Sequence, residues 1–263
     1  MGDLRKMAIG LIGGSGVYDP DVLENAEQIK VHTPYGAPSD LFTKGTINGK
    51  IVYILPRHGH NHNYNPSSVP YKANMWAFKK LGVKKLFTVS AVGSLKEEYK
   101  PGDFVFTDQF IDRTTKRDQT LYGSVHIGVA DPFCKKLRSE LINKAKELNL
   151  SHHETGTCVV IEGPRFSTKA ESKLFRSWDA DIINMTLVPE VVLAREAEIC
   201  YANIAMVTDY DCWKDQEVSH ARVLATMSAN MDNVKKLLMA IIGDVDSDVT
   251  CSQCNDALKD AGM

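Results

Sequence analysis

Two carboxylates, Asp209 and Asp211, stand two residues apart just past an apolar run, Ile199 to Val207, that indicates a buried strand. If the strand geometry continues past Val207, both side chains point the same way. Two acids aimed at one place can accept hydrogen bonds from an amino group, and one of them, kept protonated, can donate to a ring nitrogen. This pair would suit an aminopurine and its departure as a leaving group. From the spacing alone, an acidic turn that caps the next helix is the more common structure.

Two loops carry groups that can hold an anion. In Gly13–Gly14–Ser15–Gly16, which follows the apolar stretch Met7–Ile12, the glycines let backbone amides approach an anion and the serine adds a hydroxyl donor. In Pro56–Arg57–His58–Gly59, an arginine and a histidine at the end of the run Ile51–Leu55 can bind phosphate through charge-assisted bonds. The glycine loop matches neither the dinucleotide fingerprint nor the P-loop, and taken singly it is an ordinary tight turn.

Three more loops follow strand candidates and give weaker signals. The segment Ser90–Ser94, after Lys85–Val89, offers small hydroxylated residues and amides that could face an oxyanion. Phe166 could stack on a base, although a buried core aromatic is the more common role. Thr186 joins a strand to a helix and could bind an anion or serve only as an N-cap.

Histidines and cysteines give two competing interpretations. His58, His60 and His62 at alternate positions could line one face and bind a metal, as in a zinc-dependent hydrolase, but no further ligand lies at a recognisable spacing from them. The tail pair Cys251 and Cys254 could belong to a thiol–disulfide protein, since such a pair in a cytosolic chain is often a redox site. A polar loop and unpaired thiols remain open as alternatives to both.

Composition limits the class of protein. The chain has 263 residues, of which 43% are hydrophobic and 24% charged, enough for one large α/β domain or for two domains. The net charge of −2 implies no basic surface for nucleic acid. No apolar run reaches the roughly 18 residues of a transmembrane helix. The N-terminus lacks the long apolar region of a secretory signal, so we expect a cytoplasmic enzyme.

Strand candidates alternate with helical patterns, which indicates a mainly parallel or mixed sheet covered on both faces. Ligands of such folds lie at the carboxyl ends of the strands, where the loops above are found. The predicted strands are Met7–Ile12, Ile51–Leu55, Lys85–Val89, Asp103–Thr107, Thr157–Ile161, Asp181–Met185 and Ile199–Val207. The predicted helices are Pro70–Lys80, Asp131–Leu148, Val188–Glu198 and Ser219–Ile242, with Asp131 as the N-cap of the second.

A series of short, recognisable segments runs from residue 8 to about residue 240. They are Ile12–Gly16, Arg57–Gly59, Val92–Leu95, Tyr99–Asp103, Asp108–Asp112, Glu162–Ser167, Asn184–Thr186, Val188–Glu190 and Thr208–Asp211. Any one of them is weak, but together they are strongly specific. In this combination the chain resembles the trimeric purine nucleoside phosphorylase family and, within it, the branch that acts on 5′-methylthioadenosine. The tail Cys251–Ser252–Gln253–Cys254 is similar to short cysteine clusters that end some archaeal members.

The resemblance implies a single α/β domain over residues 1–263, with a central mixed, partly barrel-like sheet flanked by helices and a short cysteine-containing tail at about 245–263. It implies that phosphate is held by Ser15, Arg57, His58, Ser90, Ala91 and Thr186. The base would be surrounded by Phe166, Ser167, Asp209 and Asp211. The ribose and its 5′ substituent would meet Met185, His62, Val223, Leu224 and His126, the last from the neighbouring subunit of a trimer.

The implied reaction is phosphorolysis of methylthioadenosine to adenine and 5-methylthioribose 1-phosphate, a step of purine and methionine salvage. Phosphate would attack C1′ while the glycosidic bond loosens, and Asp209 would hydrogen-bond or protonate N7 of the departing adenine. Inorganic phosphate is a co-substrate, and neither a metal nor another cofactor is expected. Family members that prefer hydroxypurines carry asparagine where Asp209 stands, so an aspartate favours a 6-amino base.

His220 departs from the pattern of that branch, which often has an aliphatic residue there. Purine nucleoside phosphorylases have a histidine at this place for the 5′-hydroxyl, so a broader activity on adenosine or inosine is the alternative. A homotrimer, or a hexamer built as a dimer of trimers, is expected, with no nucleic acid or membrane partner.

Overall fold

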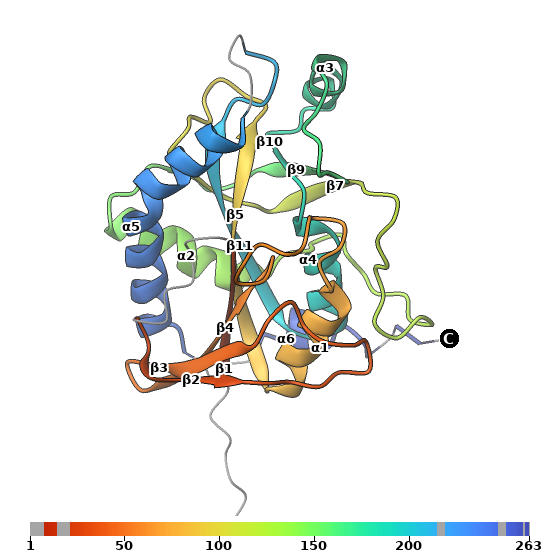
Figure 1. Cartoon of the computed structure of the whole chain (residues 1–263), viewed down its shortest axis with the longest axis vertical. Coiled ribbons are helices and arrows are strands. Elements are labelled where there is room, and N and C mark those ends of the chain that lie inside the picture. The colour runs from red at the N-terminus through yellow and green to blue at the C-terminus, as the bar shows by residue number, and fades with distance from the viewer. Residues whose placement is uncertain (1–7, 15–21, 215–218, 247–250, 260, 263) are drawn as a thin grey trace, which may run out of the picture.

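The computed structural model describes residues 8–14, 22–214, 219–246, 251–259 and 261–262, and within them an 11-stranded mixed sheet forms the centre of the molecule (Figure 1). The strands are β1 (Ala8–Gly13), β2 (Glu24–Ile29), β3 (Phe42–Ile47), β4 (Lys50–Pro56), β5 (Val83–Ser94), β6 (Phe104–Phe106), β7 (Gln109–Arg113), β8 (His152–His153), β9 (Thr157–Ile161), β10 (Ile182–Asn184) and β11 (Cys200–Asp209).

Strand β5 organises the sheet because three strands pair with it. β1 pairs in parallel with its first half, β11 in parallel along its other edge, and β10 antiparallel with Gly93 and Ser94, beyond the end of β1. The sheet therefore branches at β5 instead of continuing as one open row. β1 and β11 are buried at every position, as expected for parallel strands covered on both faces.

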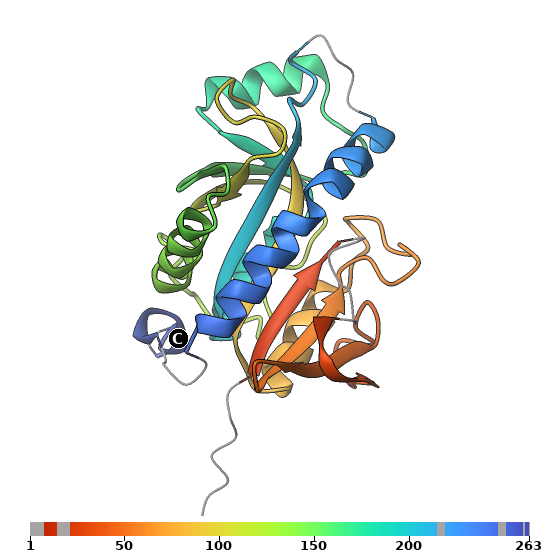
Figure 2. The same ribbon diagram turned by 90° about the vertical axis from the view of Figure 1, so that its left-hand side faces the viewer.

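Helices cover both faces of the sheet. α1 (Tyr71–Lys80) and α4 (Leu187–Glu196) pack together on one face, and α2 (Lys135–Glu147) and α5 (His220–Asp244) on the other (Figures 1 and 2). The shorter α3 (Lys169–Ser177) lies at one end of the molecule, and α6 (Ser252–Asn255) lies towards the other (Figure 1). Each helix pair fills its own apolar core against the sheet. Within the described ranges, no helix has the length and apolar character needed to cross a membrane.

Most predicted elements are confirmed with shifted ends, but the predicted start of α2 is wrong. The helix begins at Lys135 instead of following Asp131, and Cys134 is its N-cap, with Sγ accepting from the backbone N–H of Leu137 at 3.5 Å. The backbone N–H of Cys134 donates to the carbonyl of Tyr201 at 3.0 Å. The chain is thereby bound to β11 in an extended conformation, which delays the helix by one turn.

The carboxyl ends of the parallel neighbours β4, β1, β5 and β11 lie at one edge of the sheet. β10 runs back along the end of β5 and brings Asn184 to the same edge, where its side-chain amide donates to the carbonyl of Ala91 at 3.1 Å. Gly93 permits this close packing, because a Cβ there would lie 2.9 Å from Ile183 and 3.1 Å from Asp209. The loops after these strands therefore surround one shared space.

Candidate active site

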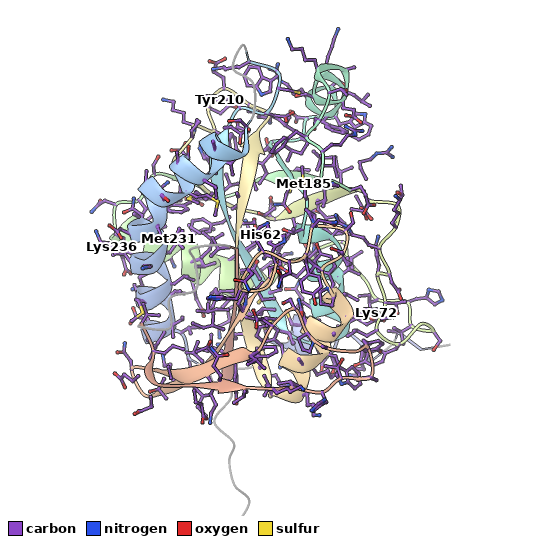
Figure 3. The ribbon with its side chains drawn as sticks, in the orientation of Figure 1. His62, Lys72, Met185, Tyr210, Met231 and Lys236 are labelled. Atoms are coloured by element: carbon purple, nitrogen blue, oxygen red, sulfur yellow. The ribbon has the colours of Figure 1, made fainter. Side chains whose placement is uncertain are left out.

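A cavity of about 520 Å³ opens at this edge of the sheet, and most of the predicted site residues line it. They are Arg57, His58, His62, Ser90, Ala91, Phe166, Ser167, Met185, Thr186, Asp209, Asp211, Val223 and Leu224. In the view of Figure 3, two of them, His62 and Met185, lie between α5 and α4.

Three predicted residues are not placed in this cavity. Ser15 lies outside the described residues. His220 is the first residue of α5, but its side chain is also outside the described part of the chain. His126 lies exposed on a loop and does not line the cavity that the described residues enclose.

Arg57 is buried directly after β4, with 2% of its surface exposed. Its Nε and Nη2 donate to the two carboxylate oxygens of Glu190 on α4, at 2.8 and 2.9 Å, and Nη1 donates to the carbonyl of Val89 at 2.9 Å. Burial alone lowers the pKa of Arg57, but the negative charge of Glu190 more than offsets it, and the pKa is raised. The three hydrogen bonds hold the guanidinium in a fixed orientation, so its N–H donors are directed when they meet an anion. The Arg57–Glu190 pair carries no net charge.

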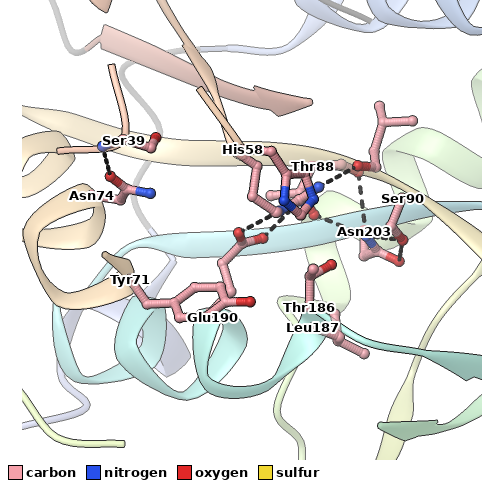
Figure 4. A network of polar contacts seen from close by, with 12 residues as sticks. Ser39, His58, Tyr71, Asn74, Thr88, Ser90, Thr186, Leu187, Glu190 and Asn203 are labelled. Carbon is pink, nitrogen blue, oxygen red and sulfur yellow. Dashed lines mark hydrogen bonds and ion pairs between the residues drawn. The ribbon is translucent and has the colours of Figure 1, made fainter. Parts of the chain in front are cut away.

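A buried polar network beneath the cavity joins this pair to Ser90 (Figure 4). The side-chain amide of Asn203 on β11 donates to Ser90 Oγ at 3.2 Å and to Thr88 Oγ1 at 2.9 Å. Thr88 donates to the hydroxyl of Tyr201, which donates to Glu190, both at 2.9 Å. The positions of the arginine and serine donors are therefore set together by β5, β11 and α4.

His58 is held in one tautomer. Its Nδ1 lies 2.8 Å from the carbonyl oxygen of Tyr64, which can only accept, so Nδ1 carries the proton and Nε2 is left for a ligand. The ring stacks on His62 with centroids 4.5 Å apart. Burial and the charge of Arg57 lower the pKa of His58 to about 4. The imidazole is therefore neutral at pH 7, and its Nε2 can accept a proton or a hydrogen bond from an anion that carries one.

We expect His58 to make the folded protein less stable as the pH falls from 7 to 5. Its pKa is about 4 when folded against 6.5 for the free side chain, so in this window the unfolded chain binds a proton that the folded chain does not. The expected loss is about 2 kcal/mol of unfolding free energy. Urea unfolding at both pH values measures it, with His58→Gln as the test and His60→Gln, an exposed histidine of the same loop, as the control. An equal pH dependence in wild type and His58→Gln would contradict the assignment.

Thr186 occupies the N-cap position of α4, but its side chain does not cap the helix. Asn184 does so, because its Oδ1 accepts from the backbone N–H groups of Thr186 and Leu187, both at 2.7 Å. These two amides are thus engaged within the protein. Thr186 therefore offers its hydroxyl to the cavity. This hydroxyl also donates to Asn184 Oδ1 at 3.3 Å.

Asp209 and Asp211 both face the cavity, although not for the reason the sequence suggested. β11 ends at Asp209, and Asp211 lies in the following turn with φ of +48°. The turn closes because Asp209 Oδ1 accepts the backbone N–H of Asp211 at 2.8 Å, while Oδ2 accepts the hydroxyl of Thr208 at 2.7 Å. Burial and the neighbouring charge of Asp209 raise the pKa of Asp211. Asp211 therefore holds a proton more readily than an isolated carboxyl does.

Much of the remaining lining is apolar, and one hydroxyl in it is unpaired among the described residues. Val223 and Leu224 from the start of α5 and Phe166 from the loop before α3 form part of the wall, and Leu224 and Phe166 are 40% and 41% exposed. Because both side chains also line the cavity, their exposed apolar surface lies at its mouth. The Oγ of Ser167 is buried without a hydrogen-bond partner among the described residues, so it can serve a ligand.

Among the described residues, the three histidines do not come together as the alternative metal site would require. His58 and His62 stack on each other, while His60 is exposed and its backbone N–H donates to Asp40 at 2.5 Å. Among the described residues, metal-ligand atoms gather only at a group of cysteines away from this cavity.

Three residues that position groups of the site were not identified from the sequence: Glu190, Asn184 and Asn203. Two of them carry a recognisable signal. Glu190 is the one acid in the apolar stretch Leu187–Ala194, and Asn203 is the one amide in the buried strand β11. A lone polar residue in a buried element must have a partner in the fold, and at these two positions that partner belongs to the site.

Comparisons with known proteins agree with this arrangement. A family model described as the phosphorylase superfamily matches residues 8–243. The S-methyl-5′-thioadenosine phosphorylase of Thermofilum pendens is 52% identical over 261 residues, which cover 98% of this chain and 99% of that protein. A methylthioadenosine phosphorylase structure from an Antarctic soil metagenomic library aligns with a TM-score of 0.92 and 42% identity over 98% and 93% of the two chains. A variant of the adenosine/methylthioadenosine phosphorylase from Schistosoma mansoni, in complex with methylthioadenosine, aligns with a TM-score of 0.86 and 39% identity over 90% and 91%.

Proposed function

This chain belongs to the phosphorylase superfamily, and we infer from that membership and from the cavity that it cleaves 5′-methylthioadenosine with phosphate, releasing adenine and 5-methylthioribose 1-phosphate. One observation carries the inference. A single cavity combines directed N–H donors from a buried Arg57–Glu190 pair with two buried carboxyls and an apolar mouth. These groups match the three parts of the substrate pair: phosphate, adenine and methylthio group.

We assign phosphate to the side of the cavity lined by Arg57, His58, Ser90, Ala91 and Thr186, together with Ser15. The guanidinium contributes charge-assisted donors, and the hydroxyls contribute neutral ones. Neutral His58 suits a phosphate that still carries a proton, because Nε2 can accept it. The protonation state of His58 therefore favours phosphate in a hydrogen-bonded, partly protonated form.

We assign the base to Asp209, Asp211, Ser167 and Phe166. A protonated carboxyl can donate to N7, an ionised one can accept from the 6-amino group, and the unpaired Ser167 hydroxyl offers one further bond. The ring of Phe166 at the mouth is placed to pack on the purine. Met185 and His62 would meet the ribose, and Val223 and Leu224 the 5′ methylthio group.

The reaction then needs only groups of the protein and its two substrates. The C1′–N9 bond breaks as a phosphate oxygen bonds to C1′, and the positive charge that develops on the ribose is stabilised by the bound phosphate. Asp209 gives N7 a proton or a hydrogen bond, so adenine leaves without carrying a full negative charge. Asp209 is 8% exposed, and this burial limits the access of water to the proton transfer.

An adenine-release assay with methylthioadenosine and phosphate tests the assignment of substrate. We expect turnover of methylthioadenosine to exceed turnover of inosine, since a 6-oxo group, unlike a 6-amino group, cannot donate a hydrogen bond to a carboxylate. Absence of adenine release, or a preference for inosine, would overturn the inferred substrate.

Adenosine is the second candidate substrate, because one structural relative is named an adenosine/methylthioadenosine phosphorylase. His220 begins α5, three and four positions before Val223 and Leu224, so the three positions share one side of the helix. An imidazole there could bond a 5′-hydroxyl. We expect His220→Val to lower adenosine turnover selectively by about fivefold to tenfold, the effect of one net hydrogen bond of about 1 kcal/mol. Paired kcat/KM measurements on adenosine and methylthioadenosine check this, and an equal effect on both would assign His220 no role at the 5′ position.

We propose a trimer-based assembly in which His126 reaches the active site of a neighbouring subunit. Its exposed position on the loop 123–130, away from the cavity of its own chain, leaves it accessible to a second copy. We expect sedimentation to give a trimer or hexamer and His126→Ala to raise the KM for methylthioadenosine a few-fold. A fully active monomer would contradict both the assembly and the role of His126.

A further inference from the structure

Four cysteines from three distant segments of the chain meet at the end of the molecule opposite α3. Cys134, Cys200, Cys251 and Cys254 have Sγ atoms that all lie within 4.8 Å of one another, and those of Cys134 and Cys251 are 3.9 Å apart. Three of the four side chains are buried. None of the four lines the cavity described above. The cluster is therefore separate from the proposed chemistry, which uses no cysteine.

Each cysteine is directed to this point by its own element. Cys134 is the N-cap of α2, and its backbone N–H donates to the carbonyl of Tyr201 at 3.0 Å, which fixes it beside Cys200 at the start of β11. Cys251 and Cys254 come from the tail, where a tight turn begins. The backbone N–H groups of Cys254 and Asn255 both donate to the carbonyl of Cys251, at 3.0 and 2.9 Å. This turn places both tail thiols on the same side of α6.

The geometry is that of a four-thiolate metal site. Zinc binds cysteine sulfur at about 2.3 Å in a tetrahedron, which places the sulfur atoms about 3.8 Å apart. The 3.9 Å separation already matches this spacing, and the widest pair would need to close by about 1 Å. The spacing Cys251-x-x-Cys254 is also the usual one for two zinc ligands in a single turn.

The surroundings fit the negative charge that four thiolates would bring. Nη1 of Arg195 on α4 donates to Cys254 Sγ at 3.7 Å, and the backbone N–H of Leu137 in the first turn of α2 donates to Cys134 Sγ at 3.5 Å. Donors of this kind outside the ligands orient them and offset the charge of the site. Four protein ligands leave no open position for water or substrate, so such a site stabilises structure and does no chemistry.

We propose that Cys134, Cys200, Cys251 and Cys254 bind one zinc ion that fastens the C-terminal tail to α2 and β11. Each thiol loses its proton as its Zn–S bond forms, and no oxidant or reductant takes part. Figure 2 shows α6 of the tail near the C-terminal end of α5 and near α2. The tail also accepts the backbone N–H of His126 at Ala261, 2.8 Å away, so the metal would steady the loop that carries this histidine.

Elemental analysis of the purified full-length chain tests the site. We expect about one zinc per chain, and a value near zero for Cys251→Ser and Cys254→Ser. Cys158→Ala is the control, because Cys158 in β9 is as buried as Cys254 but lies outside the cluster, and this variant should keep its zinc. Equal zinc content in all four proteins would place the metal elsewhere and overturn the proposal.

Two measurements on the wild-type chain keep the test independent of how the variants fold. Removing the metal with a chelator under reducing conditions should lower the melting temperature by roughly 5 to 10 °C, and zinc should restore it. Cobalt added to the metal-free chain should give the visible absorption of a tetrahedral cobalt–thiolate site. Thiol titration in denaturant and chelator, without reductant, should find every cysteine free. Finding only the two cysteines outside the cluster free, with no metal, would show that the cluster forms disulfides and would overturn the proposal.

Discussion

Replacing Arg57 with alanine is expected to raise the KM for phosphate by roughly ten- to a hundredfold, since a charge-assisted contact of about 1.5–3 kcal/mol is lost. The same change leaves Glu190 buried without its partner, which should cost about 3–5 kcal/mol of unfolding free energy. Phosphate titrations of adenine release and urea unfolding measure the two effects separately.

The double variant Arg57→Ala/Glu190→Gln distinguishes binding from stability. Removing the stranded charge should restore much of the stability lost in Arg57→Ala, while the weak use of phosphate persists. Lys44→Ala is the control, because Lys44 forms an exposed pair with Glu27 and should change stability by less than about 1 kcal/mol. Recovery of both properties in the double variant would mean that Arg57 only supports the fold.

Asp209→Asn is expected to lower kcat for methylthioadenosine by about a hundredfold, the usual contribution of a positioned acid. It should also shift preference towards inosine, because an amide can donate to N7 and face a 6-oxo group. The ratio of kcat/KM values for the two nucleosides is the measurement.

Asp103→Asn provides the comparison for this change. Asp103 is also a buried acid, but it accepts from Ser151 and Lys100 outside the cavity. The Asp103→Asn variant should have a lower free energy of unfolding but the same ratio of kcat/KM values for methylthioadenosine and inosine. If Asp209→Asn likewise leaves the ratio unchanged, Asp209 does not contact the base.

The sequence predicts best those elements whose pattern is uniform. The strand Thr157–Ile161 occurs with the predicted bounds, and β1, β4 and β11 consist mainly of apolar residues, a pattern typical of buried strands. The edge strand β2, Glu-Asn-Ala-Glu-Gln-Ile, was missed because its exposed, polar residues lack any apolar periodicity. Its strand conformation depends on its partner β3, which no local pattern reveals.

The candidate site divides in the same way. Arg57 and His58 are predicted because charged residues follow a buried strand, and the structure places both at the cavity. The shared direction of Asp209 and Asp211 was predicted from strand geometry, yet it arises from a turn with a positive φ. The neutral state of His58 and the partnership of Arg57 with Glu190 depend on contacts across the fold, which periodicity cannot supply.

Adenine release from methylthioadenosine, measured with and without phosphate, tests the proposed phosphorolysis most directly. The donors at Arg57 and Ser90 predict that release requires phosphate and that the sugar product, identified by mass, is 5-methylthioribose 1-phosphate. Equal release in phosphate-free buffer, with free 5-methylthioribose as the product, would show that water is the nucleophile and would contradict the proposed function.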